Sequence, residues 1–194
     1  DRIGFDVLEI HAAHGYLLHQ FLSPLSNLRN DQYGGSLEDR MRFPLEVFEA
    51  VSKAWPKQKA IGVRFSATDW VDRSSWDIKE STEFAKELKK RGCDFIDVSS
   101  GGNSPEQQID VGPSYQTGFA SEIKRETGIA TMAVGQITEA FQAEAIIRTG
   151  QADMVSMARG MLADPRWAWH AAEVLGEQAA YAPQYMRSNK ALRG

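Results

Sequence analysis

Short apolar runs alternate with amphipathic segments along the whole chain. Five of these runs predict strands, over 7–10, 61–65, 94–98, 130–134 and 153–157. Between and after them, apolar residues recur at helical spacing and predict helices over 36–55, 78–91, 115–126, 138–149 and onward through residue 175. The strands are apolar almost throughout, which is typical of a parallel sheet covered by helices. The pattern therefore predicts an α/β protein with a repeated strand–helix order.

Local residue types mark the ends of several of these helices. Ser36 is a suitable N-cap, and Asp39 can complete a turn that resembles a capping box. Thr138 is placed to cap the helix that follows the fourth strand, and Gly92 is a suitable residue just beyond the C-terminus of the helix 78–91. Pro44 lies inside the first helix and indicates a kink or a restart.

Two architectures fit this order, a doubly wound open sheet and part of a (β/α)₈ barrel. No Gly-x-Gly-x-x-Gly motif follows the first strand, which disfavours a dinucleotide-binding Rossmann unit. The chain has 194 residues, whereas a complete barrel typically has ~250. The first strand pattern also begins almost at once, so we expect that part of the polypeptide is missing upstream.

Composition narrows the classes of partner and of chemistry. The chain has 22 basic and 26 acidic residues and a net charge of −4, which gives no reason to expect nucleic acid or an anionic membrane as partner. No apolar run approaches the ~20 residues of a membrane span. Cys93 is the only cysteine, so this chain can form no internal disulfide, cysteine-only zinc site or iron–sulfur cluster. These features favour a cytoplasmic protein.

Polar residues and glycines follow each predicted strand, at the end where α/β proteins place their chemistry. They are His11, His14 and Tyr16; Arg64, Ser66 and Asp69; Ser99, Ser100, Gly101 and Gly102; Gly135 and Gln136; and Ala158, Arg159 and Gly160. We therefore expect the site at this edge of the sheet, with a polar or anionic ligand.

The last two strand ends are suited to a phosphate group. Glycine lets backbone N–H groups approach the anion closely, and arginine adds a bidentate charge. Gly135, Arg159 and Gly160 have this character if the five strands are the fourth to eighth of a barrel, where such sites are built. The alternative is that the glycines only form turns and that Arg159 makes a surface ion pair.

Two histidines lie three residues apart after the first strand. On a helix, His11 and His14 would share a face, and they could bind a metal or donate two hydrogen bonds to one substrate oxygen. A metal needs a third ligand, and the nearby Glu9 lies on the strand. A structural pair is the remaining alternative. His19 and His170 are single residues and are interpreted as structural or surface histidines.

Arg64 ends an apolar strand, where a buried cation needs an anionic or strongly accepting partner. That partner is either a ligand or a protein carboxylate. Asp69 and Asp97 are the candidate carboxylates.

Three stretches of the chain make a family recognisable. Residues 11–17 (HAAHGYL), 20–27 (QFLSPLSN) and 29–40 (RNDQYGGSLEDR) closely resemble the Old Yellow Enzyme family of flavin-dependent ene reductases. The His-x-x-His form is similar to the bacterial, thermophilic-like branch. Shorter matches continue in order through 63–66, 97–101, 133–135, 158–159 and 164–165, so the resemblance covers the whole chain.

The resemblance implies a (β/α)₈ barrel that holds FMN at its carboxyl edge. Residues 1–194 would form the C-terminal portion, from about the fourth to the eighth strand plus the tail. His11 and His14 resemble the residues that hydrogen-bond the substrate oxygen, and Tyr16 resembles the proton donor. The residues implied in FMN binding are Arg64, Ser100, Gly101, Gly135, Ala158 and Arg159. Ala158 stands where many relatives have glycine, but its backbone N–H remains.

The implied reaction is reduction of an activated C=C bond in an α,β-unsaturated carbonyl or nitro compound. NADPH, or NADH, would be the hydride donor, and no metal is implied. Arg187 resembles an arginine that reaches the active site of a neighbouring subunit, which implies a homo-oligomer. Five strands cannot close a barrel, so we expect the chain to be active only beside an N-terminal portion, as a split, nicked or permuted enzyme or a segment of a longer one. The alternatives are an inactive or incomplete barrel fragment and another phosphate-binding barrel enzyme.

Overall fold

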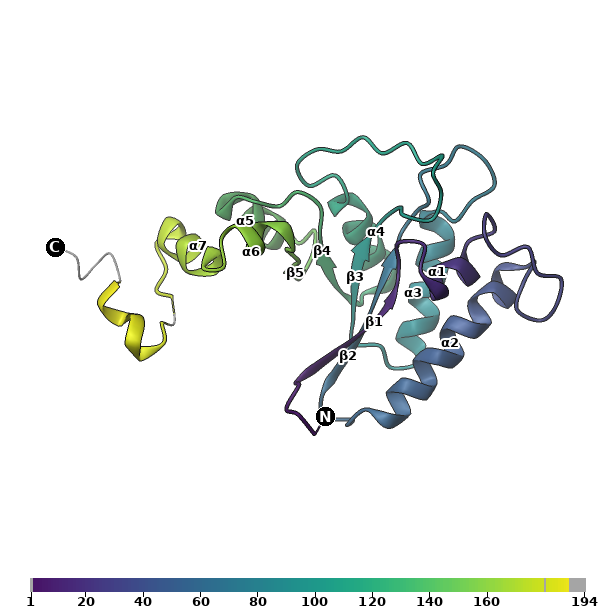
Figure 1. The fold of residues 1–194 in the computed structure, drawn as a ribbon, viewed down its shortest axis with the longest axis horizontal. Coiled ribbons are helices and arrows are strands. Elements are labelled where there is room, and N and C mark those ends of the chain that lie inside the picture. The colour runs from purple at the N-terminus through teal and green to yellow at the C-terminus, as the bar shows by residue number, and fades with distance from the viewer. Residues whose placement is uncertain (1, 180, 189–194) are drawn as a thin grey trace.

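The computed structural model describes residues 2–179 and 181–188 and contains one five-stranded parallel sheet (Figure 1). The strands pair in the order in which they occur in the sequence. They are β1 (Val7–Ala12), β2 (Ala60–Ser66), β3 (Phe95–Ser99), β4 (Ala130–Ala133) and β5 (Met154–Val155). The register places His11 beside Arg64 and Arg64 beside Asp97, so three polar residues form a row across the sheet.

Helices connect the strands in the predicted alternation. They are α1 (Leu17–Leu22), α2 (Leu37–Ala54), α3 (Ile78–Lys90), α4 (Thr117–Thr127), α5 (Ala140–Arg148), α6 (Arg159–Ala163), α7 (Trp167–Leu175) and the 3₁₀ helix η1 (Pro183–Ser188). The predicted strand–helix order is confirmed. Two short elements, α1 and η1, were not predicted, because six residues are too few to show helical periodicity.

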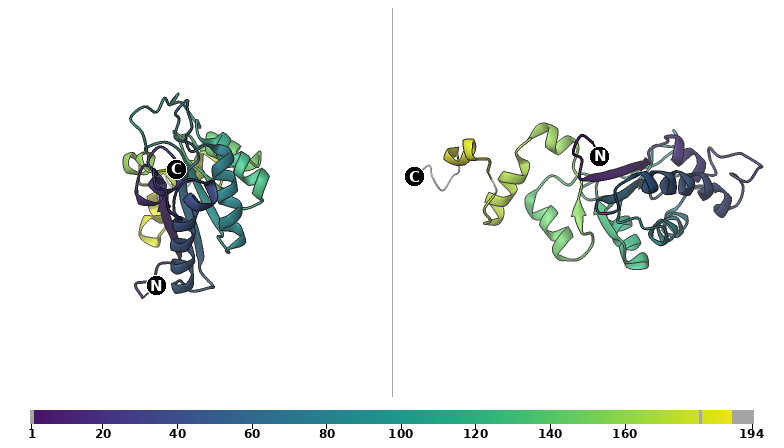
Figure 2. Two further views of the ribbon diagram at one scale, coloured as in Figure 1. Left: turned by 90° about the vertical axis from the view of Figure 1, so that its right-hand side faces the viewer. Right: turned by 90° about the horizontal axis from the view of Figure 1, so that it is seen from below.

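The core lies between the sheet and the helices that cover one side of it, α2, α3 and α4 among them (Figure 2). Phe48 of α2 and Phe84 of α3 are almost fully buried there, and the Phe84 ring centroid is 5.6 Å from that of Phe65 on β2. The opposite side of β1 is open, since Val7 and His11 are exposed while the residues that alternate with them are more buried.

Capping groups decide where α2 and α5 begin. The Ser36 hydroxyl accepts the N–H of Asp39, as predicted, and α2 then continues through Pro44 as one helix. The prediction that Thr138 caps α5 is wrong. Glu139 is the N-cap, because the side chains of Glu139 and Gln142 exchange hydrogen bonds with each other's backbone.

The C-terminal elements lie beyond β5, away from β1 and β2 (Figure 1). The η1 segment packs on α7 through aromatic rings, with the Tyr185 centroid 5.5 Å from that of Trp169. Arg166 stacks over both rings. In the part of the chain that the structure describes, no helix is long and apolar enough to cross a membrane.

Candidate active site

The carboxyl ends of the strands border a cleft of about 540 Å³. Parallel strands all end at this edge, so residues far apart in the sequence meet there. The predicted site residues that line the cleft are His14, Arg64, Ser100, Gly135, Ala158 and Arg159. The prediction of a single site at this edge therefore agrees with the positions of these six residues.

His14 enters the cleft from the turn after β1. Its backbone adopts φ = 58°, and its N–H donates a hydrogen bond to the Ser66 hydroxyl at the end of β2. Its Nε2 lies 2.6 Å from the Ser99 hydroxyl oxygen at the end of β3. Burial, and after it the nearby Arg64 charge, lowers the pKa of His14 to about 4. The imidazole is therefore neutral at physiological pH.

His11 and Tyr16 lie next to His14 but do not line the cleft itself. The His11 ring centroid is 5.2 Å from that of His14 and 5.4 Å from that of Tyr16. The three rings meet because the chain turns after β1, not because the segment is helical. Burial and the Arg64 charge also lower the pKa of His11. Two neutral imidazoles and an exposed phenol thus form one group beside the cleft.

Arg64 is held by a buried carboxylate while part of its guanidinium lacks a partner. Its Nη1 is 3.1 Å from Oδ2 of Asp97, whose side chain is 2% exposed. Burial raises the pKa of Asp97 although the Arg64 charge opposes this. The buried Nε of Arg64 has no hydrogen-bond partner among the described residues. The Arg64 side chain is 22% exposed and lines the cleft, so the accessible part of this cation can meet an acceptor on a ligand.

The ends of β4 and β5 form the other wall. Gly135 adopts φ = 121°, and a Cβ there would lie 2.9 Å from Nε2 of Gln116, so a side chain does not fit. Ala158 precedes α6, and Arg159 is its first residue. Arg159 is exposed and makes no ion pair within the described ranges 2–179 and 181–188. The residues predicted to bind a phosphate therefore lie together on this wall of the cleft.

Ser100 and Gly101 make mainly internal contacts. The Ser100 hydroxyl donates a hydrogen bond to Oε1 of Gln116. The Gly101 N–H donates to the carbonyl of Thr68, and its carbonyl accepts from the Ser66 hydroxyl. Gly101 is buried behind the cleft wall, so both of its backbone groups are already bonded within the protein.

Three remaining predictions concern a metal, the partner of Arg64 and the position of Arg187. No cluster of three metal-ligating side chains occurs in the part of the chain that is described. Asp97, one of two candidates, is the carboxylate that pairs with Arg64. Arg187 lies in η1, and its side chain falls outside what the structure describes.

Two further residues shape the cleft: Ser99, which the sequence marks only as one of the polar residues at a strand end, and Gln116, which it does not mark. Ser99 ends β3 directly before Ser100, so its position at the strand end was the available signal. Gln116 lies in the loop before α4, where no sequence pattern marks it. Its amide bonds Ser100 and the carbonyl of Val134, and so joins the ends of β3 and β4.

Residues 1–178 match the model of the NADH:flavin oxidoreductase / NADH oxidase family. The chain belongs to this family. An NADPH dehydrogenase of Geobacillus sp. (strain WCH70) is 48% identical over 184 residues, which are 95% of this chain and 53% of the relative. An NADPH dehydrogenase of Bacillus subtilis (strain 168) is 46% identical over 184 residues, again 95% of this chain and 53% of the relative. The chain thus spans about half the length of the curated relatives it matches.

Solved structures of the same fold agree with this family assignment. Morphinone reductase superposes with a TM-score of 0.70 at 29% identity over 94% of this chain and 47% of that one. A 2-naphthoyl-CoA reductase complex superposes with a TM-score of 0.80 at 25% identity over 91% of this chain and 27% of that one. The resemblance to Old Yellow Enzymes is confirmed, and so is the fold class, the part of a (β/α)₈ barrel from about its fourth to its eighth strand.

Proposed function

We propose that this chain forms the C-terminal portion of an FMN-dependent ene reductase that uses NADPH, or NADH, to reduce activated C=C bonds. The observation that carries the proposal is the gathering of neutral histidines, a half-buried arginine and a phosphate-type wall around one cleft. Family membership and the NADPH dehydrogenase relatives support the class of reaction.

The cleft residues fit FMN. The Arg64 side chain lines the cleft and brings a fixed positive charge there, which suits the electron-rich edge of an isoalloxazine ring. Gly135 and Arg159 suit the phosphate, and Ala158 adds a backbone N–H beside them. When bound, FMN would supply the hydride transfer, from the nicotinamide to the alkene. Ser100 supports this wall through Gln116, and Gly101 does so by holding the strand ends together.

The histidines orient and polarise the substrate. A neutral imidazole carries one N–H, so His11 and His14 together can donate two hydrogen bonds to one carbonyl or nitro oxygen. Both donors are in place before the reaction, which favours the negative charge that develops on this oxygen. Their lowered pKa values keep both rings as hydrogen-bond donors of constant charge across the neutral range.

Tyr16 would supply the proton. Its ring lies beside His11, 5.4 Å between centroids, and its side chain is 64% exposed, so the phenol can reach a substrate that the imidazoles hold. The phenol O–H protonates the α-carbon, and solvent restores the proton.

The site needs further chain to close it. The outer edge of β1 pairs with no other strand among the described residues, and Ile3, Phe5 and Val7 next to it are exposed apolar side chains. An unpaired edge with apolar neighbours suits another strand. We propose that an N-terminal portion of the same barrel, on the same or a separate polypeptide, adds this strand and the other wall of the FMN site.

The tail is proposed to act in a homo-oligomer. In one copy, α7 and η1 extend away from β1 and its histidines (Figure 1). Packing of Tyr185 on Trp169 fixes η1, the segment that includes Arg187, against α7. Arg187 of one copy would then contact the substrate in the neighbouring copy.

The absorbance spectrum of the purified protein, with its barrel complete, tests the cofactor and the reaction together. We expect a bound flavin spectrum, bleaching with NADPH under nitrogen, and recovery when 2-cyclohexenone is added. A colourless protein that FMN does not reconstitute would favour an inactive fragment or another phosphate-binding barrel enzyme.

A further inference from the structure

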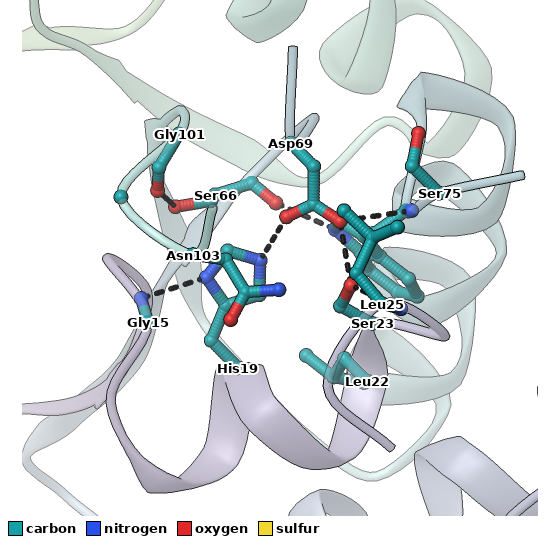
Figure 3. A network of polar contacts seen from close by, with 12 residues as sticks. Gly15, His19, Leu22, Ser23, Leu25, Ser66, Asp69, Ser75, Gly101 and Asn103 are labelled. Atoms are coloured by element: carbon teal, nitrogen blue, oxygen red, sulfur yellow. Dashed lines mark hydrogen bonds and ion pairs between the residues drawn. The ribbon is translucent and has the colours of Figure 1, made fainter. Parts of the chain in front are cut away.

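A buried histidine, His19, contacts the turn that carries the proposed substrate-binding residues. It lies on α1 with 0% exposure, and its Nδ1 is 3.0 Å from the backbone nitrogen of Gly15 (Figure 3). Gly15 stands between His14 and Tyr16 in the chain. Its carbonyl accepts a hydrogen bond from Nε2 of Gln20, so α1 holds both polar groups of this glycine.

The other side of the same imidazole faces a buried carboxylate. Nε2 of His19 is 3.0 Å from Oδ1 of Asp69, which is also 0% exposed. Oδ2 of Asp69 accepts two further hydrogen bonds, from the Ser23 hydroxyl at 2.6 Å and from the Trp76 N–H at 3.0 Å (Figure 3). Burial opposes the charge on Asp69, but the contact with the His19 ring and the hydrogen bond from Ser23 outweigh burial and lower the pKa of this carboxyl.

These contacts determine which ring nitrogen carries the hydrogen. The Gly15 N–H is only a donor, so Nδ1 of His19 must be the acceptor and carry no hydrogen. The hydrogen is therefore on Nε2, where it faces the Asp69 carboxylate. In a doubly protonated ring, the Nδ1–H of His19 would point at the N–H of Gly15, and the two hydrogens would repel each other. His19 is thus held as one neutral tautomer.

The turn that His19 holds has little other freedom. Gly15 adopts φ = 75°, and a Cβ there would lie 2.3 Å from the carbonyl oxygen of Gly102. The turn therefore packs directly on the backbone that follows β3. The hydrogen bond from the His14 N–H to Ser66 fixes the preceding residue. A change at Gly15 would alter the directions in which the His14 and Tyr16 side chains leave the chain.

We infer that His19, with its tautomer set by Asp69, is a positioning residue that orients His14 and Tyr16 through the backbone of Gly15. This inference rests on the proposed function for the roles of His14 and Tyr16. Residues 14–19 read His-Gly-Tyr-x-x-His. The inference explains the last histidine physically: it lies four residues after the glycine, and its imidazole accepts the N–H of that glycine.

Two substitutions of His19 separate positioning from packing. In His19→Asn the amide oxygen takes the place of Nδ1 and can accept the Gly15 N–H. In His19→Gln the amide nitrogen takes the place of Nε2 and can donate only to Asp69. Both leave a buried polar residue and lower the melting temperature. We expect His19→Asn to keep kcat/KM for 2-cyclohexenone within about threefold of the wild-type value, and His19→Gln to lose at least tenfold, with unchanged FMN affinity.

Asp69→Asn tests the tautomer. Trp76 and Ser23 both donate to Oδ2, so the amide oxygen of Asn takes that position and its NH₂ faces Nε2 of His19. The ring hydrogen of His19 must then move from Nε2 to Nδ1, where it repels the N–H of Gly15. We expect at least a tenfold loss of kcat/KM, which His19→Asn suppresses in the double variant. Ser23→Ala is the control, because it removes a hydrogen bond to Asp69 and leaves the His19 tautomer unchanged.

NMR of ¹⁵N-histidine-labelled, FMN-loaded wild-type protein decides the geometry without any activity measurement. We expect a hydrogen-free Nδ1 on His19 and a scalar coupling across the hydrogen bond from the Gly15 amide. A hydrogen on Nδ1, or equal kcat/KM values for the Asn and Gln variants, would overturn the inference. A wild-type protein with the expected coupling but no reduction of 2-cyclohexenone would instead refute the proposed function.

Discussion

Nε2 of His14 lies 2.6 Å from the hydroxyl oxygen of Ser99, so the ends of β1 and β3 are joined across the wall of the cleft. A neutral imidazole can rotate about two bonds, and each rotation moves the N–H that would meet the substrate. Ser99, which is 3% exposed, removes this freedom. The proposed substrate donor is therefore oriented before any ligand binds, which is the condition for effective electrostatic stabilisation.

Ser99→Ala is expected to weaken substrate binding more than cofactor binding. Without the hydroxyl, the His14 ring loses its fixed rotation, so KM for 2-cyclohexenone rises several-fold while the Kd for FMN stays within twofold. Steady-state kinetics and FMN titration measure the two effects. Ser52→Ala on α2 is the control for loss of a hydroxyl far from the cleft. An equal rise in KM and in the FMN Kd would show that Ser99 supports the cofactor wall instead.

Tyr16→Phe is expected to slow alkene reduction and leave reduction of FMN by NADPH nearly unchanged. In the proposed reaction the phenol supplies a proton only to the alkene carbon, and loss of a general acid typically costs ~10²–10⁴-fold. Stopped-flow absorbance under nitrogen separates the two half-reactions. Tyr33→Phe removes an exposed phenol that bonds Glu46 and serves as the control. Equal slowing of both half-reactions would remove Tyr16 from the role of proton donor.

Arg64→Gln is expected to weaken FMN binding and to destabilise the fold. The change leaves the Asp97 carboxylate, 2% exposed, without its cation. Breaking a fully buried pair costs ~3–5 kcal/mol, and we expect about 2 kcal/mol here because the Arg64 side chain remains 22% exposed. Urea unfolding measures this loss.

The double variant Arg64→Gln/Asp97→Asn distinguishes the two effects. Without a buried charge, it should regain most of the free energy of unfolding but none of the FMN affinity. Recovery of FMN binding in the double variant would mean that Arg64 serves only as the partner of Asp97.

Arg159→Gln is expected to weaken FMN binding by at least tenfold and to leave riboflavin binding unchanged. The two ligands differ only in the phosphate, so their comparison isolates the phosphate contact that Arg159 is proposed to make. Fluorescence titration of the protein freed of flavin measures both affinities. A parallel loss for the two ligands would place the contact elsewhere on the flavin.

The lowered pKa of His14 predicts how stability depends on pH. The unfolded histidine takes up a proton near pH 6.5, and the folded one does so only near pH 4. Between these values the unfolded state binds more protons, so its population grows as the pH falls. His14 therefore makes the free energy of unfolding decrease from pH 6.5 to 4.

His14→Asn should flatten this decrease. Urea unfolding at several pH values compares the wild-type and variant proteins, which should run parallel above pH 7, where His14 is neutral in both states. Parallel profiles down to pH 4 would contradict the lowered pKa.

Local patterns predicted the framework of the fold. The strand and helix segments and the Ser36 cap depend on neighbours within one element, so periodicity and residue type reveal them. The prediction of the α5 cap is wrong because Thr138 and Glu139 are both able to cap, and the side chain of Gln142 decides between them.

The candidate site was only partly predictable. Strand ends and the family motif placed His14 and Arg64, because all strands of a parallel sheet end at one edge. The contacts from His14 to Ser99 and from His19 to Asp69 span 85 and 50 residues. They depend on the sheet register and on how far each turn projects, which no pattern along the chain encodes. From the sequence alone, His19 is therefore interpreted as a structural or surface histidine.

The central claim is that this cleft completes a site where FMN passes hydride from NADPH to an activated alkene. Anaerobic titration tests it most directly. We predict that protein with its barrel complete binds one FMN, that one equivalent of NADPH bleaches the flavin absorbance, and that one equivalent of 2-cyclohexenone restores it and yields cyclohexanone. Protein whose flavin absorbance returns only on admission of oxygen, or that binds no FMN, would contradict the account.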